Sequence, residues 1–290
     1  MTARQDLGIV DGPMLIFGGP YGNRQATEAL LARAAALDIT PDRMLCTGDL
    51  AAYAADPQET ADLLRDAGVA VVMGNVEESL GFAADDCGCG FEDGSACDLL
   101  AARWYRYAAA AVSSETKRWM RDLPRRIDFT LAGLRFAAIH GGVERINEFI
   151  FPATPAAEKR AMLDATGADA TIGGHSGLPF VKPLEDRLWV NPGVIGLPAN
   201  DGTPRVWYGL LVPQPHGIDI RIEALSYDHA AAAAAIRAAD LPPDYAETLE
   251  TGLWPNDDVM PASDRARRGI PLEASVTTWH GRKPMGAAAD

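Results

Sequence analysis

The first 75 residues alternate between short apolar runs and longer stretches in which apolar residues recur every three or four positions. This pattern predicts strand, helix, strand, helix and strand over residues 14–19, 24–38, 43–49, 56–68 and 69–75. Such alternation is typical of βαβ units that form one sheet. Because ligands of open α/β sheets bind at the carboxyl ends of the strands, we expect a site in the turns that follow these strands.

The second half of the chain is richer in strands at short spacing, which argues for a second sheet. We expect strands over 126–133, 134–142 and 168–175, a hairpin over 180–193, and a strand pair at 205–212 and 217–227. Helices are expected over 99–112, 113–124, 154–167 and 228–243, with Ser113 or Ser114 capping the second of them. The segment Glu77–Asp98 has little periodicity and many Gly and Asp residues, so we expect a long loop there.

The length and composition fit one large domain with a tail. The chain has 290 residues, 48% of them hydrophobic, which is enough for a sizeable core. We place a single domain over residues 1–241. Residues 242–290 are punctuated by Pro and Gly, and we expect an irregular or partly ordered tail.

The formal net charge of −14 argues against partners that carry many negative charges, namely nucleic acid and an anionic membrane. The apolar runs are shorter than the roughly 18 residues that span a bilayer, and no basic segment precedes an apolar one at the N-terminus. We therefore expect a cytoplasmic protein. Four cysteines are too sparse for a disulfide framework in a chain of this length.

Four polar residues each follow a predicted strand directly: Asp49 in CTGDL, Asn75 in MGNVEE, His140 in AIHGG and His175 in IGGHSG. A carboxylate, an amide oxygen and two imidazoles are a plausible ligand set for Mn(II), Fe(II) or Zn(II). Each residue taken alone is better explained as an ordinary turn residue. Their shared position at strand ends favours a metal site.

In order and spacing, GDL, GNVEE, HGG, GHSGLPF and LWVNPGVIGLP together resemble the calcineurin-like metallophosphoesterase family, in particular its small bacterial phosphodiesterase branch. The resemblance runs from about Met14 to Leu241. It implies the metallo-dependent phosphatase fold, a four-layer αββα sandwich in which helices flank two mixed β-sheets. It also implies that Asp49, Asn75, His140 and His175 are the ligands of the second of two metals.

The chain departs from that family where the first metal would bind. Gly19 and Tyr21 stand where the family has Asp and His, and Gly177 replaces a third ligand of the same metal. Val76 replaces the histidine that donates a proton to the leaving group. The resemblance therefore implies a degenerate site that holds one divalent transition metal (Mn, Fe or Zn).

Two functions remain open on this reading. The first is a phosphoester hydrolase, a phosphatase or phosphodiesterase that uses one metal with Asp49 as a central ligand. The second is an inactive pseudo-phosphoesterase that binds a ligand or regulates another protein. Either one implies a small phosphorylated molecule as partner, and a homo-oligomer stays open. A nucleotide-phosphate loop at GGPYGN ranks last, because the phosphate-binding signatures of such loops are missing.

Further residues near the turns have alternative explanations. Tyr21 is a candidate proton donor or, more simply, a ring that plugs the lost metal position. Arg24 and Arg145 are candidate phosphate contacts, although exposed Arg at such places is common. Glu77 and Glu144 are candidates for orienting an imidazole, or are solvated.

Three cysteines, Cys87, Cys89 and Cys97, lie in the predicted loop after Asn75. Their spacing is not a strong zinc pattern, and a lid, a redox-sensitive segment and a mobile loop are the alternatives, of which we favour the last. Cys46 is expected in the core.

Overall fold

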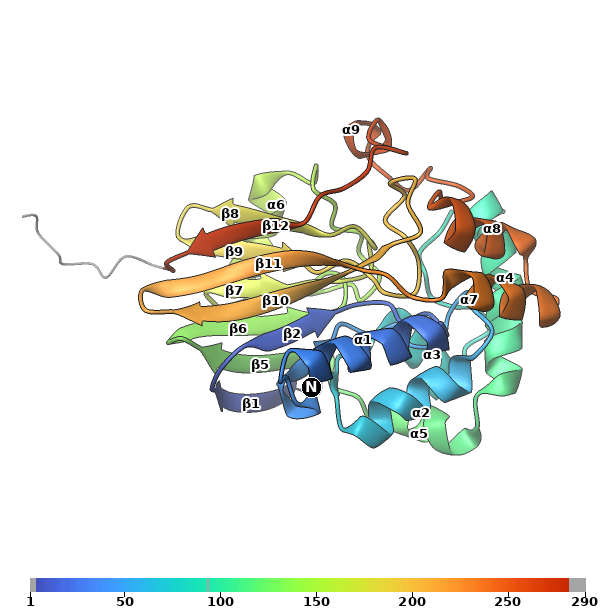
Figure 1. Cartoon of the computed structure of the whole chain (residues 1–290), viewed down its shortest axis with the longest axis horizontal. Helices are drawn as coiled ribbons and strands as arrows, with labels where there is room; N and C mark the ends of the chain where they lie inside the picture. Colours follow the sequence, from blue (N-terminus) through green and yellow to red (C-terminus); the bar gives the residue numbers. More distant parts are fainter. Residues whose placement is uncertain (1–3, 93, 282–290) are drawn as a thin grey trace, which may run out of the picture.

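The computed structural model describes residues 4–92 and 94–281 and contains two six-stranded sheets with helices outside them (Figure 1). One sheet has the order β1-β5-β6-β7-β9-β8, formed by Arg4–Val10, Arg126–Leu131, Leu134–Ile139, Ala170–Ile172, Arg187–Asn191 and Phe180–Leu184. The other has the order β12-β11-β10-β2-β3-β4, formed by Ser275–Trp279, Gly217–Leu225, Val206–Gln214, Met14–Phe17, Met44–Cys46 and Ala70–Val71. Both sheets contain parallel and antiparallel pairs, as the sequence led us to expect.

The helices are α1 Arg24–Ala36, α2 Pro57–Ala67, α3 Asn75–Phe82, α4 Ala96–Ala111, α5 Ser114–Arg121, α6 Ala156–Thr166, α7 His229–Ala238, α8 Pro243–Thr251 and α9 Ala262–Arg265, and a 3-10 turn spans Pro41–Arg43. Most of them gather on the outer side of the β10-β2-β3 sheet and at one end of the strands, whereas α6 packs against the other sheet (Figure 1).

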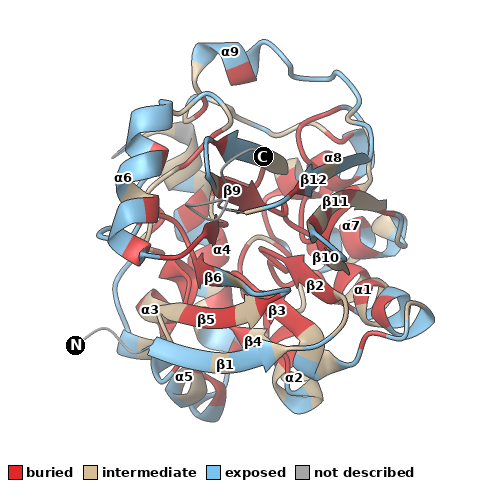
Figure 2. Ribbon diagram, turned by 90° about the vertical axis from the view of Figure 1, so that its left-hand side faces the viewer, coloured by how far each residue is buried: buried red, intermediate tan, exposed pale blue. Residues whose placement is uncertain are grey.

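Strand β2 shows how the period of two along a strand builds these layers. Met14 and Ile16 belong to the core between the two sheets, whereas Leu15 and Phe17 belong to the core under the helices. All four side chains are fully buried. In Figure 2 the central strands are buried, and β1 is an exposed edge. The αββα sandwich is therefore confirmed.

The topology brings one set of turns to one edge of the sandwich. Strands β2, β3 and β4 are parallel neighbours in one sheet, and β6, β7 and β9 are parallel neighbours in the other. A bridge between Gly18 and Val194 joins the turns after β2 and β9. The turns that carry Asp49, His140 and His175 therefore meet at this edge.

Two parts of the sequence-based interpretation change. The expected loop Glu77–Asp98 is wrong at its start, because α3 extends to Phe82, and at its end, because α4 begins at Ala96. Strand β1 was not expected at all.

Ser113, one of the two expected caps, accepts a hydrogen bond from the Thr116 N–H.

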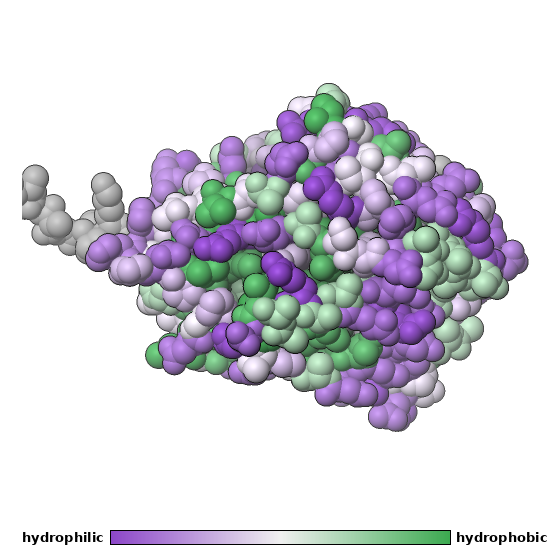
Figure 3. Space-filling view, in the orientation of Figure 1, coloured by the Kyte–Doolittle hydropathy of each residue, from purple (hydrophilic) through white to green (hydrophobic). Residues whose placement is uncertain are grey.

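The segment expected as an irregular tail contributes to the fold as far as the structure describes it. Helix α8 buries Tyr245, Ala246 and Leu249 in the core under the helices, and β12 extends a sheet by pairing with β11. Figure 3 shows polar side chains over much of one face, with smaller apolar groups between them. Within the described residues, no helix combines the length and the apolar character needed to cross a membrane.

Candidate metal centre

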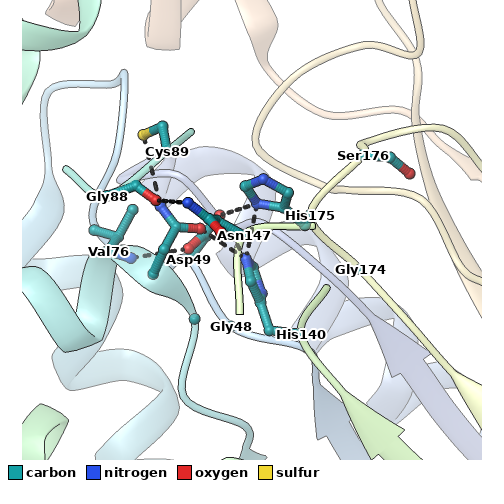
Figure 4. Close-up of polar contacts among 12 residues, drawn as sticks. Gly48, Asp49, Val76, Gly88, Cys89, His140, Asn147, Gly174, His175 and Ser176 are labelled. Carbon is teal, nitrogen blue, oxygen red and sulfur yellow. Dashed lines mark hydrogen bonds and ion pairs between the residues drawn. The ribbon is translucent and has the colours of Figure 1, made fainter. Parts of the chain in front are cut away.

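Three donor atoms, two from strand-end turns and one from the start of α3, converge on the Nε2 atom of His140. It lies 3.0 Å from Asn75 Oδ1, 3.1 Å from His175 Nδ1 and 3.2 Å from Asp49 Oδ2. Figure 4 shows Asp49, His140 and His175 pointing toward one another. All four side chains are almost fully buried. The structure thus brings together the four residues that the sequence singled out.

The imidazole of His140 is oriented by the backbone. Its Nδ1 lies 2.6 Å from the carbonyl oxygen of Thr47, which can only accept, so Nδ1 carries a proton and donates it. In the neutral ring the lone pair then lies on Nε2 and points into the cluster. This arrangement, in which a histidine is fixed through its second nitrogen, is the usual support of a metal ligand.

Asn75 is oriented by the loop after α3. Its amide Nδ2 donates to the Cys87 carbonyl at 2.9 Å and lies 3.6 Å from Cys89 Sγ, which turns Oδ1 toward His140. Cys87 and Cys89 form a disulfide, and Cys97 is free. Asn147 donates to the Gly88 carbonyl between the two cysteines (Figure 4). The disulfide loop therefore supports a candidate ligand.

Asp49 is held by the first turn of α3. Its Oδ1 accepts the backbone N–H of Val76 at 3.2 Å, which leaves Oδ2 to face the histidines. The buried carboxylate of Glu77 accepts three backbone N–H groups, those of Asp49, Leu50 and Gly74, at 2.7–2.9 Å. Glu77 thus fixes the ligand-bearing turn. In the described part of the chain its hydrogen bonds go to backbone N–H groups and not to an imidazole, which is the role that the sequence had suggested.

Burial and mutual charge set the pKa values of the cluster. Burial favours a neutral His140, but the Asp49 carboxylate outweighs it and raises the pKa of His140 above its usual value. Burial would raise the pKa of Asp49, yet the two histidines lower it on balance. Burial lowers the pKa of His175. Burial, with the charge of Asp49, raises the pKa of Glu77 to about 7.

Three residues at this edge adopt the left-handed region, which is uncommon for side chains other than Gly. The φ angles are 53° at Tyr21, 62° at Asp49 and 58° at His175. Such strain persists where the surroundings fix the backbone, and it is frequent at functional sites.

Aromatic rings lie against Gly19 and Gly177, two of the positions where the family resemblance implies lost ligands. A Cβ atom on Gly19 would lie 2.4 Å from the ring of Tyr21, and one on Gly177 would lie 3.3 Å from the ring of Trp254. Tyr21 is buried, and burial raises the pKa of its phenol well above the usual value. Both roles expected of Tyr21, the plug and the proton donor, stay predictions, and its raised pKa opposes the second.

The remaining candidates lie away from the cluster in the contacts of the described residues. Arg24 pairs with Glu28 and Asp56, and Arg145 is largely exposed and pairs with Glu148. Their role in phosphate binding stays a prediction. Glu144 is exposed, and Cys46 is fully buried, as expected of a core residue.

Two supporting features were missed in the sequence, namely the Cys87–Cys89 disulfide and the carbonyl of Thr47. The Cys-x-Cys spacing so close behind Asn75 was the available signal for the first. Nothing in the sequence indicates the second, because a backbone carbonyl carries no residue signature.

The chain is similar in sequence to several known proteins. Residues 22–211 match the family model described as "Calcineurin-like phosphoesterase superfamily domain". An uncharacterized protein of Methanocaldococcus jannaschii is 25% identical over 235 residues, which cover 74% of this chain and 89% of that protein. A probable metallophosphoesterase of Methanothermobacter thermautotrophicus is 33% identical over 72 residues, 25% of this chain and 38% of that protein.

Two solved structures share the fold. A metallophosphoesterase from Sphaerobacter thermophilus superposes with a TM-score of 0.67 at 22% sequence identity, and the match covers 83% of this chain and 99% of the other chain. A hypothetical protein from Pyrococcus horikoshii superposes with a TM-score of 0.71 at 16% sequence identity, and the match covers 83% of this chain and 99% of the other chain.

Proposed function

Because the chain belongs to the calcineurin-like phosphoesterase superfamily, we propose that it is a phosphoester hydrolase that works with one divalent transition metal. The ligands would be Asp49, Asn75, His140 and His175. The observation that carries the proposal is the convergence of their donor atoms within 3.0–3.9 Å in a buried cluster.

The chemistry of the donor set supports a cation. Asn75 Oδ1 and Asp49 Oδ2 carry no proton, and Nε2 of neutral His140 carries a lone pair, so in the neutral state these atoms repel one another. A buried cluster of this kind needs a shared proton or a cation to be stable. Carboxylate, amide and imidazole ligands suit Mn(II), Fe(II) or Zn(II).

The residues around the cluster would bind and orient a metal ion. A divalent ion held by this cluster would supply Lewis-acid activation of a phosphoryl oxygen and of water. Thr47 and Cys87 hold His140 and Asn75 in their orientations, and Glu77 holds the turn of Asp49. His175 lies at the border of a cavity, so a small phosphorylated molecule can approach the cluster from that side.

A second candidate function is binding without turnover, and the position of Val76 favours it. Only the backbone N–H of Val76 reaches Asp49, and its side chain cannot donate a proton to a leaving group. Since general acid catalysis typically contributes about 10²–10⁴-fold, its loss would slow hydrolysis greatly.

Metal content and turnover together test the proposal. The chain would be purified without chelator, as wild type, His175→Ala and the control His216→Ala, whose side chain is exposed. We expect about one Mn, Fe or Zn per chain in wild type and control, and none in His175→Ala. The metal-loaded wild type would then be assayed on phosphomonoesters and phosphodiesters.

The metal content tests the ligand set, and the turnover tests the hydrolase activity. Metal-dependent hydrolysis that is lost in His175→Ala supports the hydrolase. Metal binding with no turnover of any ester overturns it in favour of the binding protein. No metal in any preparation, even after reconstitution, contradicts both the ligand set and the hydrolase.

A further inference from the structure

An aromatic cavity lies beside His175 at the same edge of the sandwich. Its volume is about 80 Å³, and its lining includes Tyr21, Tyr53, Phe149, Tyr245 and Trp254. Tyr21 and Tyr53 come from the turns after β2 and β3, whereas Tyr245 and Trp254 come from α8 and the segment after it. The cavity is therefore built jointly by the strand-end turns and by residues beyond the part that matches the family model.

The lining suits an uncharged group. Among the residues that the structure describes, the lining contains no Lys, Arg, Asp or Glu. The phenols of Tyr21, Tyr53 and Tyr245 stay neutral, because burial raises the pKa of each. A phosphate would find no counter-charge in this cavity, so only an apolar part of a ligand is favoured inside it.

Ring packing connects the cavity to the candidate metal centre. Phe149 lies with its ring centroid 4.2 Å from that of His175. Tyr53 packs against Tyr21 at 4.7 Å and against Tyr245 at 4.9 Å. A planar ring in the cavity would therefore meet aromatic faces and edges, the contacts that aromatic groups prefer.

Two glycines bring these rings close to the ligand-bearing turns. The backbone of Gly177, with a φ of 74°, lies under the ring of Trp254, and Gly19 lies under the ring of Tyr21. Side chains at either position would push the rings away. The aromatic surface thus begins within two residues of the metal ligand His175.

We propose that the cavity binds the aromatic ring of a phosphoester substrate whose phosphate lies at the Asp49–Asn75–His140–His175 cluster. The position of the phosphate rests on the proposed function. The position of the ring rests on the cavity alone. At about 80 Å³ the cavity excludes a large fused system, and its lining of aromatic faces and edges suits a single ring. The substrate class is therefore a small phosphoester with one aromatic group next to the phosphate.

The test compares phenylphosphonate with methylphosphonate, because neither contains an ester bond that the protein could cleave. Calorimetry on the metal-loaded full chain gives the ratio of the two affinities. Burial of one ring predicts phenylphosphonate binding about 30-fold tighter than methylphosphonate. The ratio should fall toward one in Trp254→Ala, and also in Leu100→Trp, which fills the cavity instead of emptying it.

The matched control is Trp119→Ala, which removes an aromatic ring from α5 outside the cavity lining. The ratio should stay as in wild type. Circular dichroism and metal content would show that each variant is folded and loaded. Two variants that change the cavity in opposite directions keep the test decisive if one of them does not fold.

The outcomes separate the cavity from the proposed function. Equal affinity for the two phosphonates, or a ratio that neither cavity variant changes, overturns the ring site and leaves the metal-dependent function standing. If neither phosphonate binds, the phosphate part fails. Quenching of fluorescence by benzyl alcohol, present in wild type and lost in Leu100→Trp, would then still support the ring site, and its absence would overturn it.

Discussion

Acid should weaken metal binding by the proposed centre through a single proton. Asp49 raises the pKa of His140, so metal-free His140 carries a proton on Nε2 at a pH where an ordinary histidine has begun to lose it. A metal must displace that proton. His175, whose pKa is lowered, and Asp49, whose pKa is also lowered, release none near neutral pH. The expected count is one proton per metal ion below the raised pKa of His140 and none well above it.

The magnitude follows from that count. Below the raised pKa of His140, the affinity for Mn²⁺ should fall about tenfold per pH unit, which is about 1.4 kcal/mol, and above it the affinity should be constant. The direction is set by the raised pKa: competition from protons begins at a higher pH than for an unperturbed histidine. Asn75, an amide, adds no titration of its own.

Calorimetry of Mn²⁺ binding between pH 5.5 and 8, in buffers with different ionisation enthalpies, measures the proton count directly. The exposed-residue variant His216→Ala should give the same count. In metal-free protein, NMR titration should place His140 above 6.5 in wild type and lower in Asp49→Asn. A count of two, or an affinity that does not change with pH, would refute the reasoning.

Two further predictions concern the supports of the site. Glu77→Ala leaves three buried N–H groups without an acceptor, so it should lower the free energy of unfolding by about 2–4 kcal/mol. The control is Glu59→Ala, an exposed residue at the corresponding third position of helix α2, which should change the free energy of unfolding by less than about 0.5 kcal/mol. Chemical denaturation of both variants measures the two values. Reduction of the Cys87–Cys89 disulfide by a dithiol loosens the loop that orients Asn75, and it should weaken metal binding by about tenfold. An unchanged metal affinity in the reduced protein would contradict the role of this disulfide in supporting Asn75.

The sequence could predict the cluster because parallel strands share an edge. Asp49, Asn75, His140 and His175 each follow a strand, and the register of the strands brings their turns together without further information. The alternation of apolar residues in β2 and the 3.6-residue period in α1 and α2 likewise carry the local structure. Local patterns thus sufficed for these elements, whereas α3 and α8 also bury one face but were not predicted.

The remaining elements depend on contacts that are distant in the sequence. The first turn of α3 is fixed by Glu77, which binds the backbone of residues 27 and 28 positions earlier. Strand β1 is a largely exposed edge whose partner, β5, begins 122 positions after it. Strand β12 is also mostly exposed and pairs with β11. Neither edge strand buries a face that would impose alternation on its sequence.

The glycines and the aromatic rings beside the cluster are physically coupled. Losing an acid or a histidine alone would leave a buried polar void, which needs water or an ion to satisfy its surroundings. Here Gly19 and Gly177 remove the side chains, and the rings of Tyr21 and Trp254 occupy the adjoining space. Trp254 lies beyond the part of the chain that matches the family model, and it is anchored by its indole N–H on the Pro198 carbonyl at 2.7 Å. The side of the cluster next to Gly19 and Gly177 is thus an apolar surface, while the four donors keep their support, and this combination favours a ligand that is anionic at one end and aromatic at the other.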